Sequence, residues 1–423
     1  MRTIARLLLV CLAVTLLVGC PKQTGTLVPG ASEEFDKPLP PGRMGLVKIT
    51  DPALIPNFMQ ACAADRRDLR LAVANSLNYM SKPSSKEAYS RAYGQFGWEF
   101  SHERMVASLH AFDAILGSNM TPEQMNATLR SQFDVYASVG WNGKWDVMFT
   151  GYYTPIFDAS PVRSEKFKYP LYRQPKDLQK GPDGVILGQY PSRMELETTH
   201  ASRLSGLELY YLADPFEVYI AHVQGSAKLR LTDGSFVTVG YTANNGHEYV
   251  SIGKQLVDEN KIAKGKLSLR AIIDYFKAHP GEVASYTRRN PRFVFFDKIS
   301  SEPRGCLNEP VTPWRSIATD KAIFPRAGVT FVAAGMPRRS GNLIDMIPET
   351  RFAMDQDAGG AIRAPGRCDI YMGVGDEAGE LAGRTQEKGR LYYLLIKQPA
   401  GGAAMPSATP AAPATAAPLP VVK

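Results

Sequence analysis

The second half of the chain, from about residue 290, consists of short apolar segments separated by glycine and proline. Each segment has the length and the aromatic or β-branched content that are typical of a strand. Frequent Gly and Pro between strands favour a barrel over a parallel sheet. The predicted strands are Phe293–Phe296, Val329–Ala333, Arg351–Met354, Asp369–Met372 and Leu391–Ile396.

The first part of the chain predicts helices, because apolar residues recur there three or four positions apart. One of these helices begins at Thr121-Pro-Glu-Gln124, where Thr caps the helix, Pro fills its first turn and Gln closes a capping box. We therefore predict a mainly β protein with an N-terminal helical portion. The three apolar stripes are Leu69, Val73, Leu77 and Met80; Met105, Leu109, Phe112 and Leu116; and Met125, Leu129, Phe133 and Tyr136.

Between these parts, from Trp145 onward, short strands and turns predominate. Alternating apolar residues from Phe216 to His222 predict a strand that leads into Val223-Gln-Gly-Ser226. An Asp233-Gly234 turn between two apolar runs predicts a hairpin that ends near Val239. Ser268 is placed to cap a helix over Leu269–Phe276.

The N-terminus has the features of an export signal, predicted over residues 1–19. Arg2 and Arg6 precede a short apolar stretch, and Leu17-Val-Gly-Cys20 resembles the bacterial lipobox. A lipid on Cys20 would anchor the protein to a membrane, and Pro21 favours the outer membrane, facing the periplasm. The alternative is an ordinary signal peptide with an incidental cysteine. Residues 20–44 are predicted to be the lipidated Cys and a flexible tether, and the Ala/Pro-rich residues 398–423 a disordered, extended tail.

Composition excludes several classes of function. The net charge of +8 is dispersed, without a basic run, so nucleic acid is a poor candidate for a partner. Beyond the signal and Cys20, the three cysteines Cys62, Cys306 and Cys368 leave at least one free thiol or intermolecular bond. Neither His222 nor His247 has metal-ligand spacing with another residue, and we expect no metal and no cofactor.

The run from Asp357 to Gly373 carries the strongest functional signal. Asp357 stands one residue before Gly359-Gly360, and a following β-like segment carries Asp369. Two glycines permit backbone conformations that a Cβ forbids, and they allow a ligand to approach the main chain closely. A lone acid on such a turn suits proton transfer. The alternative is a tight turn flanked by two solvated aspartates.

Several ordered motifs carry a family resemblance between about Tyr152 and Leu395. They are Gly151-Tyr-Tyr-Thr-Pro155, Pro191-Ser-Arg193, Val223-Gln-Gly-Ser226, Asn245-Gly246-His-Glu-Tyr249, Ser251-Ile-Gly253, Asn290-Pro-Arg-Phe-Val-Phe-Phe296 and Asp357-Ala-Gly-Gly-Ala-Ile362. Through them the chain resembles the membrane-bound lytic murein transglycosylase A family, with a closing block similar to the domain named for three aspartates. The resemblance implies a double-psi β-barrel from residues 45–154 and 297–397, a second β domain inserted at 155–296, and a glycan groove between them.

The resemblance also implies an activity, cleavage of the MurNAc–GlcNAc β-1,4 bond of peptidoglycan with formation of a 1,6-anhydromuramyl end. The substrate's own 6-hydroxyl attacks, so one carboxyl suffices as acid and then base. The family assigns this role to the residue that is Asp357 here. Two other readings stay open: a non-catalytic murein-binding lipoprotein, and a hydrolase of the same bond. The resemblance suggests peptidoglycan glycan strands as the partner, with murein synthases or divisome proteins as further partners.

An acid of this kind needs a raised pKa, which burial or a neighbouring carboxylate can supply. Asp355 is expected to be a solvated edge residue, although it shares a face with Asp357 if the strand is regular. Asp369 either holds backbone N–H groups or tunes the pKa of Asp357, and Glu248 is the runner-up acid. In place of the family's usual pattern, the chain has Arg363-Ala364 and Cys368. Asp320 completes the three aspartates, and the expected substrate-binding residues are Tyr152, Tyr153, Thr154, Gln224, Ser226, Asn245, Tyr249, Gly359 and Gly360.

Overall fold

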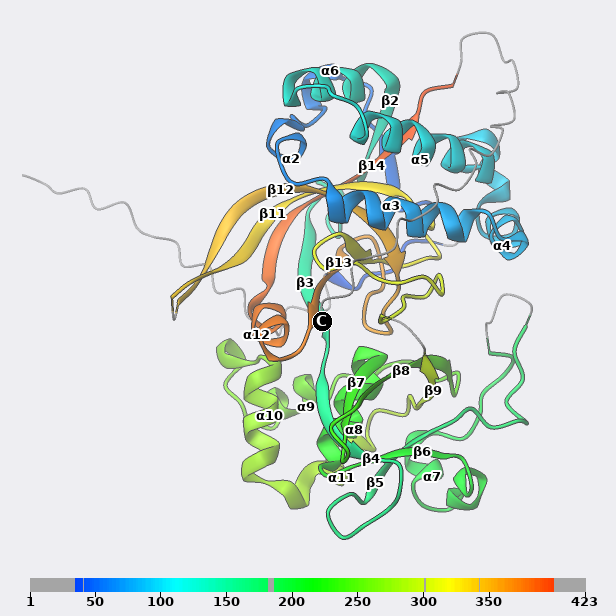
Figure 1. Ribbon diagram of the computed structural model, residues 1–423, viewed down its shortest axis with the longest axis vertical. Coiled ribbons are helices and arrows are strands. Elements are labelled where there is room, and N and C mark those ends of the chain that lie inside the picture. The colour runs from blue at the N-terminus through cyan, green and yellow to red at the C-terminus, as the bar shows by residue number, and fades with distance from the viewer. Residues whose placement is uncertain (1–34, 41, 182–185, 300–301, 342, 399–423) are drawn as a thin grey trace, which may run out of the picture.

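The computed structural model describes residues 35–40, 42–181, 186–299, 302–341 and 343–398. The predicted signal sequence, Cys20 and the tail from residue 399 lie outside the described residues. Within these ranges, no helix is long and apolar enough to cross a membrane. Two β-sheets form the frame of the molecule, and they lie one above the other in Figure 1.

The first sheet closes into a barrel. Its strands follow the order β1–β2–β14–β11–β12–β10–β13–β3, and β14 also pairs with β3, so six strands form a closed ring. Two neighbouring pairs are parallel, β10 with β12 and β3 with β13. This confirms the prediction of a mainly β chain with a barrel. The strands are β1 (Leu46–Lys48), β2 (Phe133–Ser138), β3 (Val147–Thr154), β10 (Ser316–Ala318), β11 (Val329–Ser340), β12 (Leu343–Asp357), β13 (Arg367–Val374) and β14 (Gln386–Ile396).

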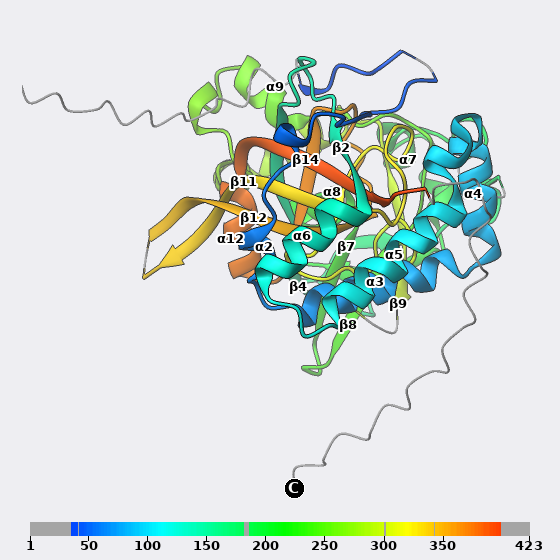
Figure 2. The ribbon, with the colours of Figure 1, turned by 90° about the horizontal axis from the view of Figure 1, so that it is seen from above.

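Helices from the N-terminal part lie across one end of the barrel, as Figure 2 shows from above. The three predicted helices are confirmed, and Thr121 forms the predicted capping box with Gln124. The third predicted helix ends at Gln132, so the prediction is wrong for the last two residues of its apolar stripe. Phe133 and Tyr136 belong to strand β2, and both are buried. The helices are α2 (Met59–Cys62), α3 (Arg67–Met80), α4 (Pro83–Tyr93), α5 (His102–Leu116) and α6 (Pro122–Gln132), and α12 (Asp376–Arg384) packs on β3 and β13.

The second sheet has the order β5–β6–β4–β7–β8–β9, and all its strands lie between β3 and β10 in the sequence. The predicted hairpin is β7 with β8, and Ser268 caps α10 as expected. The elements are β4 (Ile156–Ser160), β5 (Tyr169–Tyr172), β6 (Glu208–Leu212), β7 (Ser226–Leu231), β8 (Phe236–Asn244), β9 (Val294–Ile299), α7 (Arg193–Leu196), α8 (Pro215–Gln224), α9 (Ile252–Asp258), α10 (Leu269–Ala278) and α11 (Val283–Thr287). The 3-10 helices are η1 (Pro52–Leu54), η2 (Gly94–Phe100), η3 (Ala201–Leu204), η4 (Lys264–Lys266) and η5 (Pro280–Glu282).

The strand predicted from Phe216 to His222 is wrong, because these residues form helix α8. Asp214 caps the first turn, Pro215 opens the helix, and Gly225 ends it with a φ of 75°. The helix is buried on several sides, so it lacks the polar face that would have revealed its period.

The predicted flexible tether is also wrong over its last residues. The Phe35 ring packs edge-on against Trp141, with centroids 4.5 Å apart. Asp36 lies 3.7 Å from the Arg367 guanidinium of β13. The segment that precedes β1 is therefore attached to the barrel.

Candidate active site

The end of strand β12 presents Asp357 to three hydrogen-bond donors. Its Oδ1 accepts from the backbone N–H groups of Cys306 and Ala358, each at 2.8 Å. Its Oδ2 accepts from the Tyr152 hydroxyl, also at 2.8 Å. The side chain is half-buried, so the carboxyl is fixed in orientation while one side stays open to solvent.

Gly305 allows the Cys306 loop to approach this carboxyl. A Cβ at Gly305 would lie 2.5 Å from the Gln356 carbonyl oxygen and 3.1 Å from Asp357 Cγ. Such contacts are too short for any side chain, so only glycine fits here. Neither Gly305 nor Cys306 is predicted from the sequence as a site residue, because neither lies in a recognisable motif and both act through the backbone.

Tyr152 reaches Asp357 from strand β3, whose register places it beside Tyr371 of β13. The two rings lie 5.1 Å apart between centroids. Burial raises the pKa of Tyr152 well above its usual value, and the charge of Asp357 adds to this rise. The hydroxyl therefore stays protonated and can donate to the carboxylate.

The two half-buried aspartates of the site both have raised pKa values. Burial raises the pKa of Asp357, and the hydrogen bonds from Ala358, Tyr152 and Cys306 offset only part of this rise. Burial likewise raises the pKa of Asp369, and the charge of Asp357 contributes to it. A raised pKa is what a carboxyl needs if it is to hold a proton near neutral pH.

Asp369 lies on strand β13, where it pairs with Thr150 of β3. Its Oδ1 is buried and has no hydrogen-bond partner among the described residues. The proposed role of holding backbone N–H groups is therefore wrong. The charge of Asp357 raises the pKa of Asp369, so the two carboxyls interact, and a role for Asp369 in tuning Asp357 stays a prediction.

Asp355, two residues before Asp357, is fully buried, so the prediction of a solvated edge residue is wrong. Its Oδ1 accepts from the Lys321 ammonium in a buried ion pair. Its Oδ2 accepts from the hydroxyls of Thr319 and Tyr393, each at 2.8 Å. A register shift between β10 and β12 at this point gives the two aspartates different surroundings. Asp355 is satisfied inside the barrel and is unavailable to a ligand.

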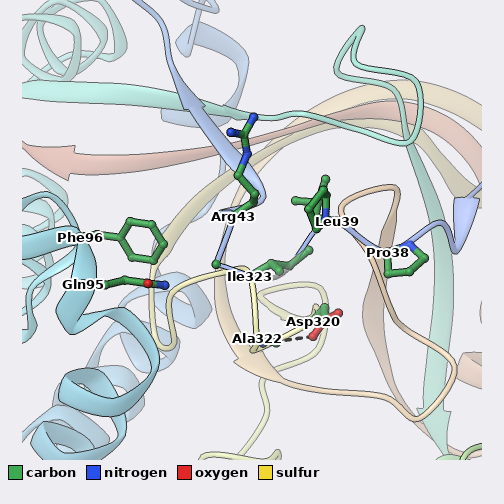
Figure 3. A pocket seen from close by; sticks show the side chains of 10 residues that line it. Pro38, Leu39, Arg43, Gln95, Phe96, Asp320, Ala322 and Ile323 are labelled. Carbon is green, nitrogen blue, oxygen red and sulfur yellow. Dashed lines mark hydrogen bonds between the residues drawn. The ribbon is translucent and has the colours of Figure 1, made fainter.

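Asp320 supports the loop that follows Asp357. Its Oδ2 accepts from the Ala364 N–H and its Oδ1 from the Ala322 N–H, both at 3.1 Å. Figure 3 shows the second bond in a pocket that Pro38 and Arg43 also line. No described hydrogen bond joins Asp320 to the other two aspartates, so it is a positioning residue.

The Gly-Gly turn is used for close packing. Neither Gly359 nor Gly360 has a positive φ. A Cβ on Gly359 would lie 2.8 Å from Ile362 Cγ1, and one on Gly360 would lie 3.3 Å from Arg292 Nε. The left-handed residue of this loop is Ala364, with a φ of 68°.

Several predicted ligand residues instead join the two sheets. The Thr154 hydroxyl lies 3.1 Å from the Ser226 hydroxyl and 3.0 Å from that of Tyr371. Gln224 Oε1 accepts from the Tyr153 N–H at 3.2 Å. Thr154, Ser226 and the Tyr153 side chain are buried, so they support the junction and are closed to a sugar ring.

Asn245 is fully buried within the second part of the molecule. Its Nδ2 donates to the carbonyls of Pro191 and Pro291, and its Oδ1 accepts from the Phe293 N–H. The prediction that it contacts substrate is therefore wrong. Tyr249, four residues later, is half-buried, and its Cβ would lie 3.5 Å from a Cβ on Gly360, so it adjoins the loop that follows Asp357.

Glu248 is a poor alternative acid. Its side chain is 83% exposed, and its nearest cation is Arg363, at 3.9 Å. Its exposed position differs from that of Asp357, whose pKa is raised by burial.

The cysteines are unbridged among the described residues. Cys62 and Cys368 are buried and Cys306 is exposed, so the free thiol expected from an odd number is confirmed. Burial raises the pKa of Cys62 to about 11 and that of Cys368 well above its usual value. Protonated buried thiols are packing groups rather than nucleophiles.

Comparison with known proteins supports the two-part organisation of the site. A family model described as the MltA specific insert domain matches residues 148–297, and one described as the 3D domain matches residues 315–395. The membrane-bound lytic murein transglycosylase A of Escherichia coli K12 is 35% identical over 272 residues, which cover 63% of this chain and 71% of that protein. The Vibrio cholerae protein of the same description is 31% identical over 276 residues, covering 64% and 72%.

The chain belongs to the membrane-bound lytic murein transglycosylase A family. Solved structures of the family agree in fold. The structure of E. coli MltA with bound chitohexaose superposes with a TM-score of 0.60 at 27% identity, over 86% of this chain and 97% of that one. A murein transglycosylase from Agrobacterium tumefaciens has a TM-score of 0.65 at 24% identity, over 83% and 98%, and supports the fold alone.

Proposed function

We propose that this family member is a peptidoglycan lytic transglycosylase in which Asp357 is the single acid and base. It cleaves the MurNAc–GlcNAc β-1,4 bond and leaves a 1,6-anhydromuramyl end. The observation that carries the proposal is the Asp357 carboxyl itself, which is half-buried, raised in pKa and held by three donors. No other carboxyl of the predicted set combines these features.

The hydrogen bonds assign different tasks to the two oxygens of Asp357. Backbone N–H groups can only donate, so Oδ1 must accept from Cys306 and Ala358 in both protonation states. The proton is therefore carried on Oδ2, beside Tyr152. A tyrosine hydroxyl can donate or accept, so it can stay bonded while Asp357 releases its proton and later regains one.

Protonation of the glycosidic oxygen by Oδ2 begins the reaction. The muramyl 6-hydroxyl then attacks C1 and passes its proton to the Asp357 carboxylate. A nucleophile that is already attached to the sugar has a high effective concentration, so no second carboxylate is needed to activate water. Asp369 interacts with Asp357 through charge, since the Asp357 carboxylate raises the pKa of Asp369 and favours its protonated form.

The chitohexaose in the E. coli relative supports a peptidoglycan glycan strand as the ligand of this chain. We propose that the strand lies between the barrel and the second sheet, with the reacting bond at Asp357. Tyr152, Tyr249 and the Gly359-Gly360 turn form the wall that the sugar meets. Gln224, Thr154, Ser226 and Asn245 stabilise the protein behind that wall.

The architecture implied by the family extends the proposal. Residues 45–154 and 297–397 form a double-psi barrel, and residues 155–296 are an inserted domain, in accord with the segregation of strands between the two sheets. The relatives are described as membrane-bound. A lipid on Cys20 holds the protein at the outer membrane, facing the periplasm, where murein synthases or divisome proteins are candidate partners. In the Cys20→Ser variant the protein should leave the membrane fraction, and retention there in high salt would contradict the lipid anchor.

Product chemistry tests the proposed reaction. Murein sacculi are digested in ¹⁸O-labelled water, and the muropeptides are analysed by mass spectrometry. We expect 1,6-anhydromuramyl ends that are one water lighter than the reducing sugar and carry no label. A labelled reducing end as the primary product would show a hydrolase, with Asp369 as the candidate second carboxylate. Absence of cleavage would support the alternative, a non-catalytic murein-binding lipoprotein.

A further inference from the structure

Two arginines lie beside the catalytic loop without a close carboxylate. Arg292 precedes strand β9 and contacts Gly360, three residues after Asp357. Arg363 belongs to the same loop as Gly360, and its side chain is 48% exposed. Arg292 donates to the His247 carbonyl at 3.0 Å and Arg363 lies 3.9 Å from Glu248, the next residue, so both side chains approach the same segment.

The described residues leave this pair of positive charges largely uncompensated. Arg292 donates to the His247 carbonyl at 3.0 Å and forms no ion pair with a described carboxylate. Arg363 has only Glu248, at 3.9 Å, and that side chain is 83% exposed. An exposed pair at this distance contributes little free energy. Partial burial of a guanidinium beside a like charge costs free energy unless an anion joins it.

The substrate of the proposed reaction supplies such an anion. Every muramyl unit carries a lactyl group, to which a stem peptide with free carboxylates is attached. Guanidinium groups bind carboxylates through paired hydrogen bonds, and two guanidiniums can hold one carboxylate between them. A Cβ on Gly360, three residues after Asp357, would lie 3.3 Å from Arg292 Nε, so the stem peptide of a muramyl unit at Asp357 can reach the arginines.

We propose that Arg292 and Arg363 form a binding site for a stem-peptide carboxylate of the muramyl unit being cleaved. The inference rests on the proposed function and adds a substrate class to it: glycan that still bears charged stem peptides. The site selects substrate without touching the reacting atoms. Peptide-free glycan is accordingly a poorer ligand, although its glycosidic bond is the same.

Binding measurements separate this inference from the lytic activity. The Asp357→Asn protein is titrated with a GlcNAc–MurNAc tetrasaccharide that bears tripeptide stems, with the same sugar after amidase removal of the stems, and with a version whose stem carboxylates are amidated. We expect the charged ligand to bind about tenfold more tightly than either of the others, as for a charge-assisted hydrogen bond. Equal affinity for all three ligands would overturn the proposal, whether or not the wild type is lytic.

Variants then locate the site. Arg363→Gln and Arg292→Gln, each in the Asp357→Asn background, should bind the charged ligand as weakly as the peptide-free one, with affinity for the latter unchanged. Arg67→Gln is the matched control, because this arginine of α3 has an 89% exposed side chain and its removal changes the net charge equally. Arg363→Gln is the safer variant for folding, since Arg292 is half-buried. If Arg363→Gln lowers both affinities alike, or behaves as the control does, the arginines are not the site.

Discussion

The barrel and the second sheet use their polar residues in opposite ways. In the barrel, Asp357 at the end of β12 and Asp369 on β13 are half-buried carboxyls. Asp357 Oδ2 bonds to the exchangeable Tyr152 hydroxyl, and the buried Asp369 Oδ1 has no hydrogen-bond partner among the described residues. In the second part, Asn245 is fully buried and all its hydrogen bonds go to the backbone of neighbouring turns. Both sets stand in family motifs. A shared motif therefore marks chemistry in one part of this molecule and a folded turn in the other, and only the surroundings distinguish them.

Replacement of Asp357 by Asn should give the largest effect on activity. The amide keeps the shape of the carboxyl but cannot exchange the proton, so lytic turnover should fall by about 10²- to 10⁴-fold or more. Release of anhydromuropeptides from sacculi measures this loss. Turnover near wild type in a folded variant would remove the assignment, and Glu248 would be tested next.

Asp357→Asn should also change how the stability of the fold depends on pH. The folded-state pKa of Asp357 is raised, so the native state binds more protons than the unfolded chain above the ordinary pKa of 3.8. This group stabilises the fold at low pH, and that contribution is lost as the pH rises through the folded-state value. Asp357→Asn should abolish this loss of stability at high pH. The difference in thermal unfolding temperature, variant minus wild type, should therefore be larger at pH 8 than at pH 4.

In the second sheet, Asn245→Ala should lower stability while leaving the chemistry alone. It leaves the Pro191 carbonyl and the Phe293 N–H without their described partner, while the Pro291 carbonyl keeps the Arg193 N–H. We expect the free energy of unfolding to fall by about 3 kcal/mol. Denaturant titration measures this change, and activity per folded molecule should stay near wild type. A stable variant with a selective loss of glycan affinity would return Asn245 to the binding site.

Within the barrel, Asp369→Asn should change how kcat/KM depends on pH. The Asp357 charge raises the pKa of Asp369. Like charges act on each other reciprocally, so an ionised Asp369 hinders the ionisation of Asp357, and its replacement should lower the pKa of Asp357. Because the reaction begins from the protonated acid, the high-pH limb of kcat/KM should move to lower pH. Asp320→Asn serves as a control, since Asp320 holds the loop by hydrogen bonds elsewhere. An unchanged pH profile would make Asp369 structural.

The smallest expected effect is at Ala364. Its φ of 68° lies in the left-handed region, which costs an alanine about 1 kcal/mol more than a glycine. Ala364→Gly should therefore raise the free energy of unfolding by at most about 0.6 kcal/mol, because the extra freedom of glycine in the unfolded chain offsets about 0.4 to 1 kcal/mol of the gain. A decrease in stability would show that the loop conformation is not strained.

Local patterns predicted much of the fold. Capping residues and apolar periods located α3, α5, α6 and α10, and short apolar segments located β9 of the second sheet and the barrel strands β11 to β14. Helix α8 was missed because a helix buried on several sides also satisfies a two-residue alternation. The cap at Asp214 and Gly225 at the end were the available signals.

The candidate site was less predictable, because its geometry comes from distant segments. Asp357 was identified from its own motif. Its bond with Tyr152 joins residues 205 positions apart, and Gly305 and Cys306 act through backbone contacts that no side-chain pattern reveals. Conversely, Asn245 and Thr154 have ligand-like side chains whose burial only the fold determines.

The closure of the barrel by β14 has a consequence for the order of folding. This last strand pairs with β2 and β3, whose residues lie more than two hundred positions earlier, and with β11. Such distant pairings form late, whereas the second sheet takes all its strands from one continuous stretch and can assemble first. Tyr152, Cys306 and Asp357 thus meet only when the chain is complete and β14 has docked. A partly folded molecule lacks the assembled site around Asp357, so we expect peptidoglycan cleavage to begin only after folding is complete.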